Sequence, residues 1–433
     1  MKEIKEILVE FKEEGLPKDL IERKIKIEWM QKKANVFAGI RRSGKTYLMF
    51  QTIKNFNFKN VFYINFEDER IIEPNIKHLT NLLPTIKQLF EVKDKIYLFV
   101  DEIQRINGWE RWAKRMAENP NVLLFISGSS SKLTSYEIPT MLRGRSLTNY
   151  VFPLSFREFL KFKNFKFNLK TINYSTKKPL LIKFFNEYLI YGGFPEIVLT
   201  EKQKKLKLLQ EYFTTILMRD ILEKHEIKNK AGIEAFMKFL INNFSRYMSF
   251  SKATNWLKSI GIKTGKQTLI NYYSYIKEAF FINSTQIFSY KIKDKEQYPL
   301  KVYIADNGFV TALTVKQKNI GWLYEQLVAN NLFKKRYEDP NIEIAYFKKQ
   351  DYEVDFVIKE GLKVKQLIQV CYNLNEEETK KRELRALLHA SKELKCKNLI
   401  MINEDYEGEE EISWFGIKRK IKFIPLWKWL LFQ

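Results

Sequence analysis

Four short apolar runs in the first 130 residues have the length and composition of buried β-strands. The runs cover 35–38, 60–65, 96–100 and 122–126, and polar residues or glycines follow each of them. Continuous apolar runs of this length are typical of parallel strands that are covered on both faces by helices. The pattern therefore predicts an α/β domain with a parallel sheet, in which functional side chains gather where the strands end.

The middle of the chain has a helical pattern. From residue 154 to about 283, apolar residues recur at spacings of three and four, with lysines between them. Two of the predicted helices are joined by GIKTGK at 261–266, which predicts a helix-turn-helix with the longer turn of winged variants. The second helix offers polar side chains for phosphates and base edges: Lys266, Gln267, Asn271, Ser274 and Lys277. A module that only packs beside another domain has the same pattern, and the sequence leaves both readings open.

A glycine-rich loop follows the first predicted strand. The segment GIRRSGKTYLMF at 39–50 fits G-x-x-x-x-G-K-[ST] without a mismatch. In such loops backbone N–H groups surround phosphate oxygens, and the following helix directs the positive end of its dipole at them. Lys45 is expected to reach the β- and γ-phosphates of ATP or GTP, and the Thr46 hydroxyl to ligate Mg²⁺. The predicted nucleotide-binding residues are Gly39, Arg42, Ser43, Gly44, Lys45, Thr46 and Tyr47.

Polar residues that follow the third and fourth strands are candidates for the chemistry. Asp101 is expected to hold Mg²⁺ through water, and Glu102 to polarise the attacking water. In the serine-rich segment after 122–126, Ser129 is a candidate for sensing the γ-phosphate, although small polar residues also form ordinary turns. Arg143 and Arg145 are candidate arginine fingers that reach the nucleotide of a neighbouring subunit, with surface charge or a DNA contact as the alternative.

These motifs together resemble those of a large prokaryotic, mainly archaeal, ATPase family. The segments that carry the resemblance are GIRRSGKT, YINFEDER, FVDEIQRINGWERW, SGSSSKL, LRGRS, PLSFREF and YGGFPEIVL, and the similarity runs from about residue 25 to 429. Members of that family join an AAA-type module to a winged helix and a C-terminal restriction-endonuclease-like domain. The resemblance implies this architecture for the present chain, while the function of the family is poorly defined.

The last third has the element order of a PD-(D/E)xK nuclease core. A predicted helix at 321–333 carries Glu325, the segment YEVDFVIKEGLKVKQLIQVCY at 352–372 carries Asp355 and Gln369, and a helix at 376–394 follows. Glu325, Asp355 and Gln369 are therefore a possible second metal site, because their oxygens suit a hard cation. Cys371 stands where such nucleases have lysine, and a thiol cannot replace an ammonium in cleavage. We expect a retained fold without cleavage.

The amino-acid composition favours one kind of partner and argues against several classes of protein. The net charge of +24, from 75 Lys and Arg against 51 Asp and Glu, favours a polyanionic partner such as DNA, although a lysine-rich proteome gives the same excess. Two cysteines and three histidines argue against a disulfide framework or a Cys/His zinc site. No stretch of 18 apolar residues occurs and the N-terminus is charged, so we expect a cytoplasmic protein without stable membrane insertion. The terminal segment 421–433 is expected to pack on its own core rather than on a membrane surface.

The sequence thus predicts three domains and leaves three functions to be distinguished. The predicted domains are an AAA-type ATPase domain at 1–205 (core 25–153, helical lid 154–205), a winged-helix domain at 206–295 and a nuclease-like domain at 296–433. The favoured function is a Mg²⁺-dependent ATPase that acts on or with DNA and forms homo-oligomers. The alternatives are a slow nucleotide-gated switch that binds a protein partner, and an ATP-dependent DNA nuclease.

Overall fold

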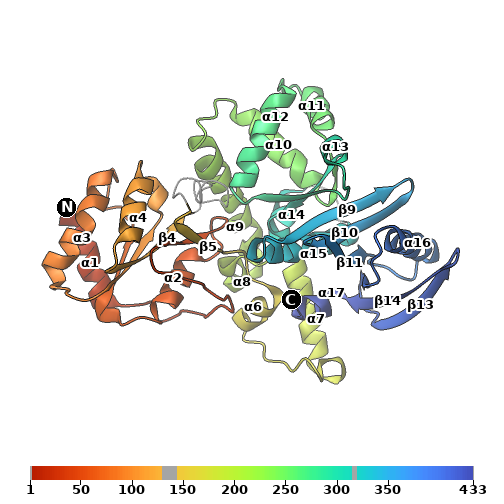
Figure 1. Cartoon of the computed structure of the whole chain (residues 1–433), viewed down its shortest axis with the longest axis horizontal. Coiled ribbons are helices and arrows are strands. Elements are labelled where there is room, and N and C mark those ends of the chain that lie inside the picture. The colour runs from red at the N-terminus through yellow and green to blue at the C-terminus, as the bar shows by residue number, and fades with distance from the viewer. Residues whose placement is uncertain (1, 129–143, 315–318, 433) are drawn as a thin grey trace. The chain divides into compact units, whose positions relative to one another are not determined.

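The computed structural model describes residues 2–128, 144–314 and 319–432 (Figure 1). The chain divides into two compact units, Met1–Phe152 and Pro153–Gln433. The segment 154–205, predicted to be a lid of the first domain, lies in the second unit; the finer domain boundaries stay predictions. In the three described ranges, no helix is long and apolar enough to cross a membrane.

A five-stranded parallel sheet forms the centre of the first unit (Figure 1). Its strands are β1 (Ala34–Ala38), β2 (Val61–Asn65), β3 (Ile96–Asp101), β4 (Val122–Gly128) and β5 (Ser146–Tyr150). They lie in the order β2-β3-β4-β1-β5, which confirms the predicted α/β fold with a parallel sheet. The sequence SLTNY of β5 escaped prediction because Asn149 is its one buried residue, so the strand lacks an apolar run.

Helices cover both faces of this sheet. The helices of the first unit are α1 (Lys2–Glu14), α2 (Lys45–Ile53), α3 (Ile76–Phe90) and α4 (Trp109–Glu118), with short 3₁₀ helices η1 (Phe58–Asn60) and η2 (Ile103–Arg105). Phe37, Phe99 and Phe125 pack with residues of α1 and α2, and the rings of Phe99 and Phe125 stack with centroids 4.4 Å apart. The alternate strand residues, which point to the other face, are equally buried, and α4 contacts β1 and β4.

The second unit is largely helical in its first half. Its helices are α6 (Phe156–Phe162), α7 (Lys178–Tyr191), α8 (Pro195–Leu199), α9 (Lys202–Thr215), α10 (Lys230–Asn242), α11 (Phe250–Ser259), α12 (Lys266–Glu278), α13 (Ile292–Gln297), α14 (Asn307–Leu313), α15 (Ile320–Glu338), α16 (Glu377–Glu393) and α17 (Leu426–Leu431), with η4 (Ile172–Tyr174) and the π-helix η5 (Ile216–Glu223). The segment PLSFREF starts α6 with a capping box, in which Ser155 and Glu158 each accept a hydrogen bond from the other's backbone N–H. The apolar residues of α17 are buried, so the end of the chain packs on its own unit.

A nine-stranded mixed sheet runs through the second unit (Figure 1). Its strands are β6 (Arg246–Met248), β7 (Ile282–Ile287), β8 (Leu300–Ile304), β9 (Ile342–Lys349), β10 (Tyr352–Glu360), β11 (Lys363–Val370), β12 (Leu399–Asn403), β13 (Gly408–Trp414) and β14 (Ile417–Pro425). The order is β13-β14-β12-β11-β10-β9-β7-β8-β6. The short β6 lies inside the stretch that was predicted to be helical. Because β7 pairs with both β8 and β9, the strands of the helical half and of the last third form one sheet.

The motif YGGFP packs tightly against the segment that follows β8. The carboxylate of Asp306 accepts hydrogen bonds from the backbone N–H of Gly193 and of Gly308, each at 2.8 Å. Gly192 has φ of 74°, and a Cβ at this position would lie 1.5 Å from Asp306 Oδ1. Burial raises the pKa of Asp306 to about 6, while the two N–H donors act in the opposite direction. Glycine at 192 is therefore required by both the backbone conformation and the space available.

Candidate functional site

The glycine-rich loop connects β1 to α2 in the first unit. Gly44 immediately precedes α2 with φ of 92°, and Arg42 also has a left-handed backbone with φ of 67°. A Cβ on Gly39 would lie 2.0 Å from Val151 O, so glycine here permits the close approach of the neighbouring segment. Lys45 is buried, and its ammonium donates to the carbonyls of Gly39 and Ile40, each at 3.1 Å. The first turn of α2 thus carries its lysine folded over the loop.

Asp101 joins the loop to the ends of the neighbouring strands. Thr46 Oγ1 donates a hydrogen bond to Asp101 Oδ2 at 2.6 Å, and Tyr63 from β2 donates to the same oxygen at 3.0 Å. Asp101 Oδ1 accepts from the hydroxyl of Ser127 in β4 and from the backbone N–H of Glu102. Because β2, β3 and β4 are parallel and adjacent, their carboxyl ends bring these side chains to one edge of the sheet.

Glu102, the residue after Asp101, has an unusual backbone conformation. Its backbone is left-handed, with φ of 53°, and its side chain accepts a hydrogen bond from Gln104 Nε2. Burial raises the pKa of Glu102 to about 7; the ammonium of Lys45 acts against this shift, and the carboxylate of Asp101 adds to it. A carboxylate whose pKa lies close to neutral pH is suited to exchange protons with a bound water.

The loop and its surroundings fit a nucleotide phosphate chain. The buried Ser43 Oγ has no hydrogen-bond partner within the described part of the chain, which leaves a polar atom available at the loop. Arg23, which is also buried, donates from Nη1 to the carbonyl of Ser43 at 2.9 Å and holds the loop from behind. The Thr46–Asp101 pair presents oxygen ligands of the kind that Mg²⁺ prefers. The predicted binding residue Tyr47 is exposed beside the loop. Taken together, the residues of the loop and its surroundings suit ATP and Mg²⁺.

Three further residues were predicted to take part in the reaction. Ser129 and Arg143 lie outside the described residues, so their predicted roles stay predictions. Arg145 immediately precedes β5. Its backbone carbonyl accepts a hydrogen bond from the N–H of Ala34 at the amino end of β1, and its guanidinium Nη2 forms an ion pair with Glu118 at 2.9 Å. The glycine-rich loop follows the carboxyl end of β1, so Arg145 lies at the opposite edge of the sheet from its own loop.

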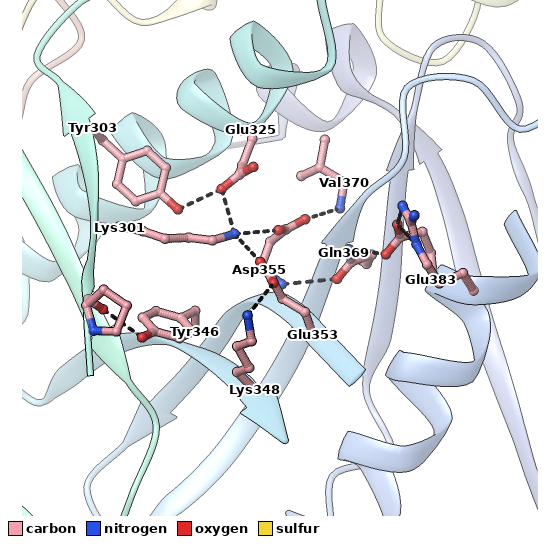
Figure 2. A network of polar contacts seen from close by, with 12 residues as sticks. Lys301, Tyr303, Glu325, Tyr346, Lys348, Glu353, Asp355, Gln369, Val370 and Glu383 are labelled. Atoms are coloured by element: carbon pink, nitrogen blue, oxygen red, sulfur yellow. Dashed lines mark hydrogen bonds and ion pairs between the residues drawn. The ribbon is translucent and has the colours of Figure 1, made fainter. Parts of the chain in front are cut away.

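A second polar site lies in the second unit, where a buried lysine contacts three carboxylates (Figure 2). The ammonium of Lys301 in β8 lies 3.2 Å from Glu325 Oε1, 2.8 Å from Glu353 Oε1 and 3.0 Å from Asp355 Oδ1. Tyr303, two residues further along β8, donates to Glu325 Oε1 at 2.8 Å. We call Lys301, Glu325, Asp355 and the half-buried Glu353 the buried carboxylate cluster. Burial raises the pKa of Glu325 to about 8, and the nearby carboxylate of Asp355 adds to this shift.

A bulge in β10 places Asp355 in this cluster. The register of β10 against β9 shifts between Val354 and Val357, on either side of the aspartate. Bulges of this kind re-aim a side chain at the point where the ladder is interrupted. Asp355 Oδ2 accepts a hydrogen bond from the N–H of Val370 in β11 at 3.0 Å, so its second oxygen is held by the adjacent strand.

The third predicted metal ligand is directed elsewhere. Gln369 Oε1 accepts from the backbone N–H of Asp355 at 3.0 Å, and Gln369 Nε2 donates to Glu383 on α16 at 2.6 Å. Cys371 is buried in the apolar core below α16, and burial raises the pKa of its thiol to about 11. The residue in the usual lysine position is thus a neutral core side chain.

Several of these residues were not identified from the sequence. Tyr63 and Ser127 are part of the predicted strand ends, but nothing in the sequence shows which hydroxyl reaches Asp101. Lys301 carried a visible signal, because a charged residue interrupts the apolar strand LKVYI and shares one face with Tyr303. Its partners are 24 to 54 residues away, which sequence spacing cannot reveal.

Helix α12 has one buried and one exposed face, while its role in a helix-turn-helix stays a prediction. α12 buries Leu269, Tyr272 and Ile276. Its exposed side chains include all five residues predicted to be available for DNA, Lys266, Gln267, Asn271, Ser274 and Lys277, and also Thr268.

Comparisons with known proteins place the chain in a family. Residues 31–160 match a family model described as an AAA domain. Residues 182–319 and 320–429 match two models described as domains of unknown function, DUF8612 and DUF4143, neither of which names a winged helix or a nuclease. The solved Walker-type ATPase PABY2304 of Pyrococcus abyssi is similar over 72% of this chain and 94% of its own, with 15% identity and a TM-score of 0.42.

Two relatives match almost end to end. An uncharacterized protein of Haemophilus influenzae is 27% identical over 403 residues, which is 92% of this chain and 94% of the relative. The uncharacterized protein MJ1544 of Methanocaldococcus jannaschii is 40% identical over 416 residues, which is 95% of this chain and 91% of the relative. The chain therefore belongs to the family of MJ1544, and its residues 31–160 match an AAA domain, the P-loop type of nucleotide-binding domain.

Proposed function

We propose that this protein hydrolyses ATP with Mg²⁺ and uses the cycle of binding and hydrolysis to act on or with DNA. The observation that carries the ATPase proposal is the contact of Thr46 with Asp101, next to the buried Glu102. This arrangement joins a phosphate-binding loop, two ligands for a hard cation and a candidate base at one edge of the parallel sheet.

In the proposed reaction, the backbone N–H groups of the loop and the ammonium of Lys45 bind the phosphates. Lys45 leaves the carbonyls of Gly39 and Ile40 to do so, because its present hydrogen bonds point it back at the loop. Thr46 and Asp101 would hold Mg²⁺, which supplies charge neutralisation for the β- and γ-phosphates. Glu102 orients the attacking water and accepts its proton, and Ser127 together with Tyr63 keeps Asp101 oriented.

The DNA part of the proposal rests on the helices and strands between α10 and β8. The order α10, β6, α11, α12, β7, β8, with β8 antiparallel to both β6 and β7, is the order of a winged helix. In such modules the second helix of the pair enters the major groove. The exposed face of α12 supplies Lys266 for phosphate and Gln267 with Asn271 for base edges, and the net charge of +24 favours the approach of a polyanion.

The last third supports a nuclease-like fold in a binding role. Helix α15, strands β9, β10 and β11, helix α16 and strand β12 follow one another in the order of a PD-(D/E)xK core. Cys371 in the apolar core and Gln369 turned toward Glu383 argue against cleavage. We propose that this part binds or positions DNA without cutting it.

We also propose that the protein works as a homo-oligomer. Arg145 lies at the opposite sheet edge from its own loop, so it can contact a nucleotide only in a neighbouring subunit. Such an arginine stabilises the charge that develops on the transferred phosphoryl group.

Measurement of ATP hydrolysis with and without DNA tests the proposal. We expect Mg²⁺-dependent hydrolysis that duplex or single-stranded DNA accelerates. A rate that DNA leaves unchanged would point instead to a nucleotide-gated switch with a protein partner. Plasmid nicking by the same preparation, compared with Asp355→Ala, tests the nuclease alternative; cleavage that Asp355→Ala removes would support it and contradict the binding role.

A further inference from the structure

The buried carboxylate cluster already contains a cation. An ammonium group has three hydrogen-bond donors. Those of Lys301 face three different carboxylates, Glu325, Glu353 and Asp355, at distances of 2.8 to 3.2 Å (Figure 2). The lysine side chain is 3% exposed, while Glu325 and Asp355 are 10% and 9% exposed. All donors of the ammonium are therefore used inside the protein.

The side chains do not fit a divalent metal in this arrangement. Glu325 and Asp355 each direct an oxygen at Lys301, and the amide oxygen of Gln369 is held by a backbone N–H. Asp355 Oδ2 is held by the N–H of Val370. Within 2–128, 144–314 and 319–432, no group of three or more His, Cys, Asp or Glu side chains is arranged to hold a metal ion. The positive charge that offsets these carboxylates is the ammonium of Lys301 in β8.

We propose that Lys301 is the permanent cation of the buried carboxylate cluster, in the place where a metal-dependent nuclease would hold a divalent ion. The sheet geometry favours this role. In the strand order β10-β9-β7-β8, strand β8 presents Lys301 and Tyr303 on one face, and both side chains contact Glu325 of α15. The lysine thus ties β8 to α15 and β10 without any metal. The inference is independent of the proposed ATPase, since it concerns residues of the second unit alone.

A catalytic role for this lysine is the competing reading, and two observations oppose it. A lysine that steadies a substrate phosphate needs a donor to spare and a path to solvent. Lys301 has neither, since three carboxylates take its donors and its side chain is almost wholly buried. Burial opposes the charged form of Lys301, but the surrounding carboxylates dominate and raise its pKa well above the ordinary value. The ammonium is therefore held charged by the protein rather than made available to a ligand.

The sign of a stability change distinguishes an internal ion cluster from a metal site. In a metal site without metal, removal of one carboxylate relieves repulsion and raises the Tm. In an internal ion cluster, the same removal leaves the ammonium with fewer partners and lowers the Tm. For Asp355→Asn in EDTA-treated, nucleotide-free full-length protein, we expect the Tm to fall by roughly 5 °C or more. Thermal unfolding followed by circular dichroism measures it.

Lys301→Met and an exposed control complete the experiment. Lys301→Met should lower the Tm by a similar amount, because three carboxylates then face one another. Glu360→Gln, on the same strand as Asp355, loses an exposed pair with Lys365 at 3.5 Å, so its Tm should change by less than about 1 °C. If Lys301→Met does not fold, the Asp355→Asn comparison still decides the question.

Titration of the wild-type protein with Mn²⁺ is the second arm. We expect the Tm of the unit that contains the cluster to be unchanged by Mn²⁺. A rise of the wild-type Tm with Mn²⁺ that Asp355→Asn removes would overturn the proposal. So would an unchanged or higher Tm for Asp355→Asn in EDTA. Either result would show that the cluster is a metal site.

Discussion

Thr46 donates a hydrogen bond of 2.6 Å to Asp101, and this contact joins two segments that are 55 residues apart in the chain. The threonine belongs to the first turn of α2 and the aspartate to the end of β3. Their contact brings the phosphate-binding loop to the same sheet edge as Glu102.

Lys45→Ala should prevent tight ATP binding. The buried ammonium lies against the carbonyls of the loop, and its loss should weaken binding on the order of 100-fold, or about 2.7 kcal/mol. Isothermal titration calorimetry with ATP and Mg²⁺ measures this change. Lys54→Ala is the matched control, because Lys54 caps the same helix and pairs with Glu22 at the surface. An affinity within about threefold of wild type for Lys45→Ala would contradict its assignment.

Glu102→Gln should preserve nucleotide binding and stop turnover. The amide keeps the size of the side chain and its contact with Gln104, but it cannot accept a proton from water. We expect the rate of ATP hydrolysis to fall by roughly 10²–10⁴-fold. A phosphate-release assay together with calorimetry on the same variant measures both properties. Hydrolysis at the parent rate would show that another residue serves as the base.

The stability of the first unit should depend on the ionisation of Glu102. Its folded-state pKa of about 7 exceeds the ordinary value of 4.5, so the folded state binds the proton more tightly than the unfolded state. Stability is therefore lost as pH rises from about 4.5 toward and past 7. Glu102→Gln should be more stable than wild type at pH near 8, on the order of 2 kcal/mol, and the difference should vanish near pH 4.5.

Urea unfolding of nucleotide-free protein at several pH values measures this dependence. Glu69→Gln is a control, because Glu69 is an exposed carboxylate in the same unit. A difference between wild type and Glu102→Gln that stays constant over the pH range would contradict the assigned burial effect.

Gly192→Ala should destabilise the second unit strongly. A Cβ would overlap the carboxylate of Asp306, and the backbone has φ of 74°. Gly361→Ala separates the two causes, since Gly361 also has positive φ but nothing lies within 4 Å of its Cβ position. We expect a loss of about 1 kcal/mol for Gly361→Ala and roughly 3 kcal/mol or more for Gly192→Ala in chemical unfolding. Equal losses would mean that Asp306 moves aside without cost.

Lys266→Ala should weaken DNA binding without changing ATP hydrolysis in the absence of DNA. Lys266 begins α12 and is exposed, so the loss of one phosphate contact should reduce the slope of log affinity against log salt by about 1. Fluorescence anisotropy with labelled duplex DNA over a series of salt concentrations measures the slope. Lys258→Ala, an exposed lysine in the last turn of α11, is the control. Equal effects of both variants would place the DNA elsewhere or indicate non-specific attraction.

The sequence by itself determined the elements whose signal is local. The apolar runs of β1 to β4, the glycine-rich loop before α2, and the paired Asp101 and Glu102 are visible because strand burial and phosphate binding restrict neighbouring residues. The exposed face of α12 also followed from its 3.6-residue period. β5 was missed because its sequence is largely polar and its position is set by pairing with β1.

Only the tertiary structure decided which distant groups meet. That Tyr63 and Ser127 share Asp101, and that Asp306 fills the space left by Gly192, depends on pairing and packing between remote segments. Lys301 is the clearest case: its strand precedes α15 and β10 in the chain, yet its ammonium lies among the carboxylates that these two elements carry. Charges interact through space over a few ångströms, whereas sequence motifs record only separation along the backbone, so the cation of that cluster could be found only once the sheet was in place.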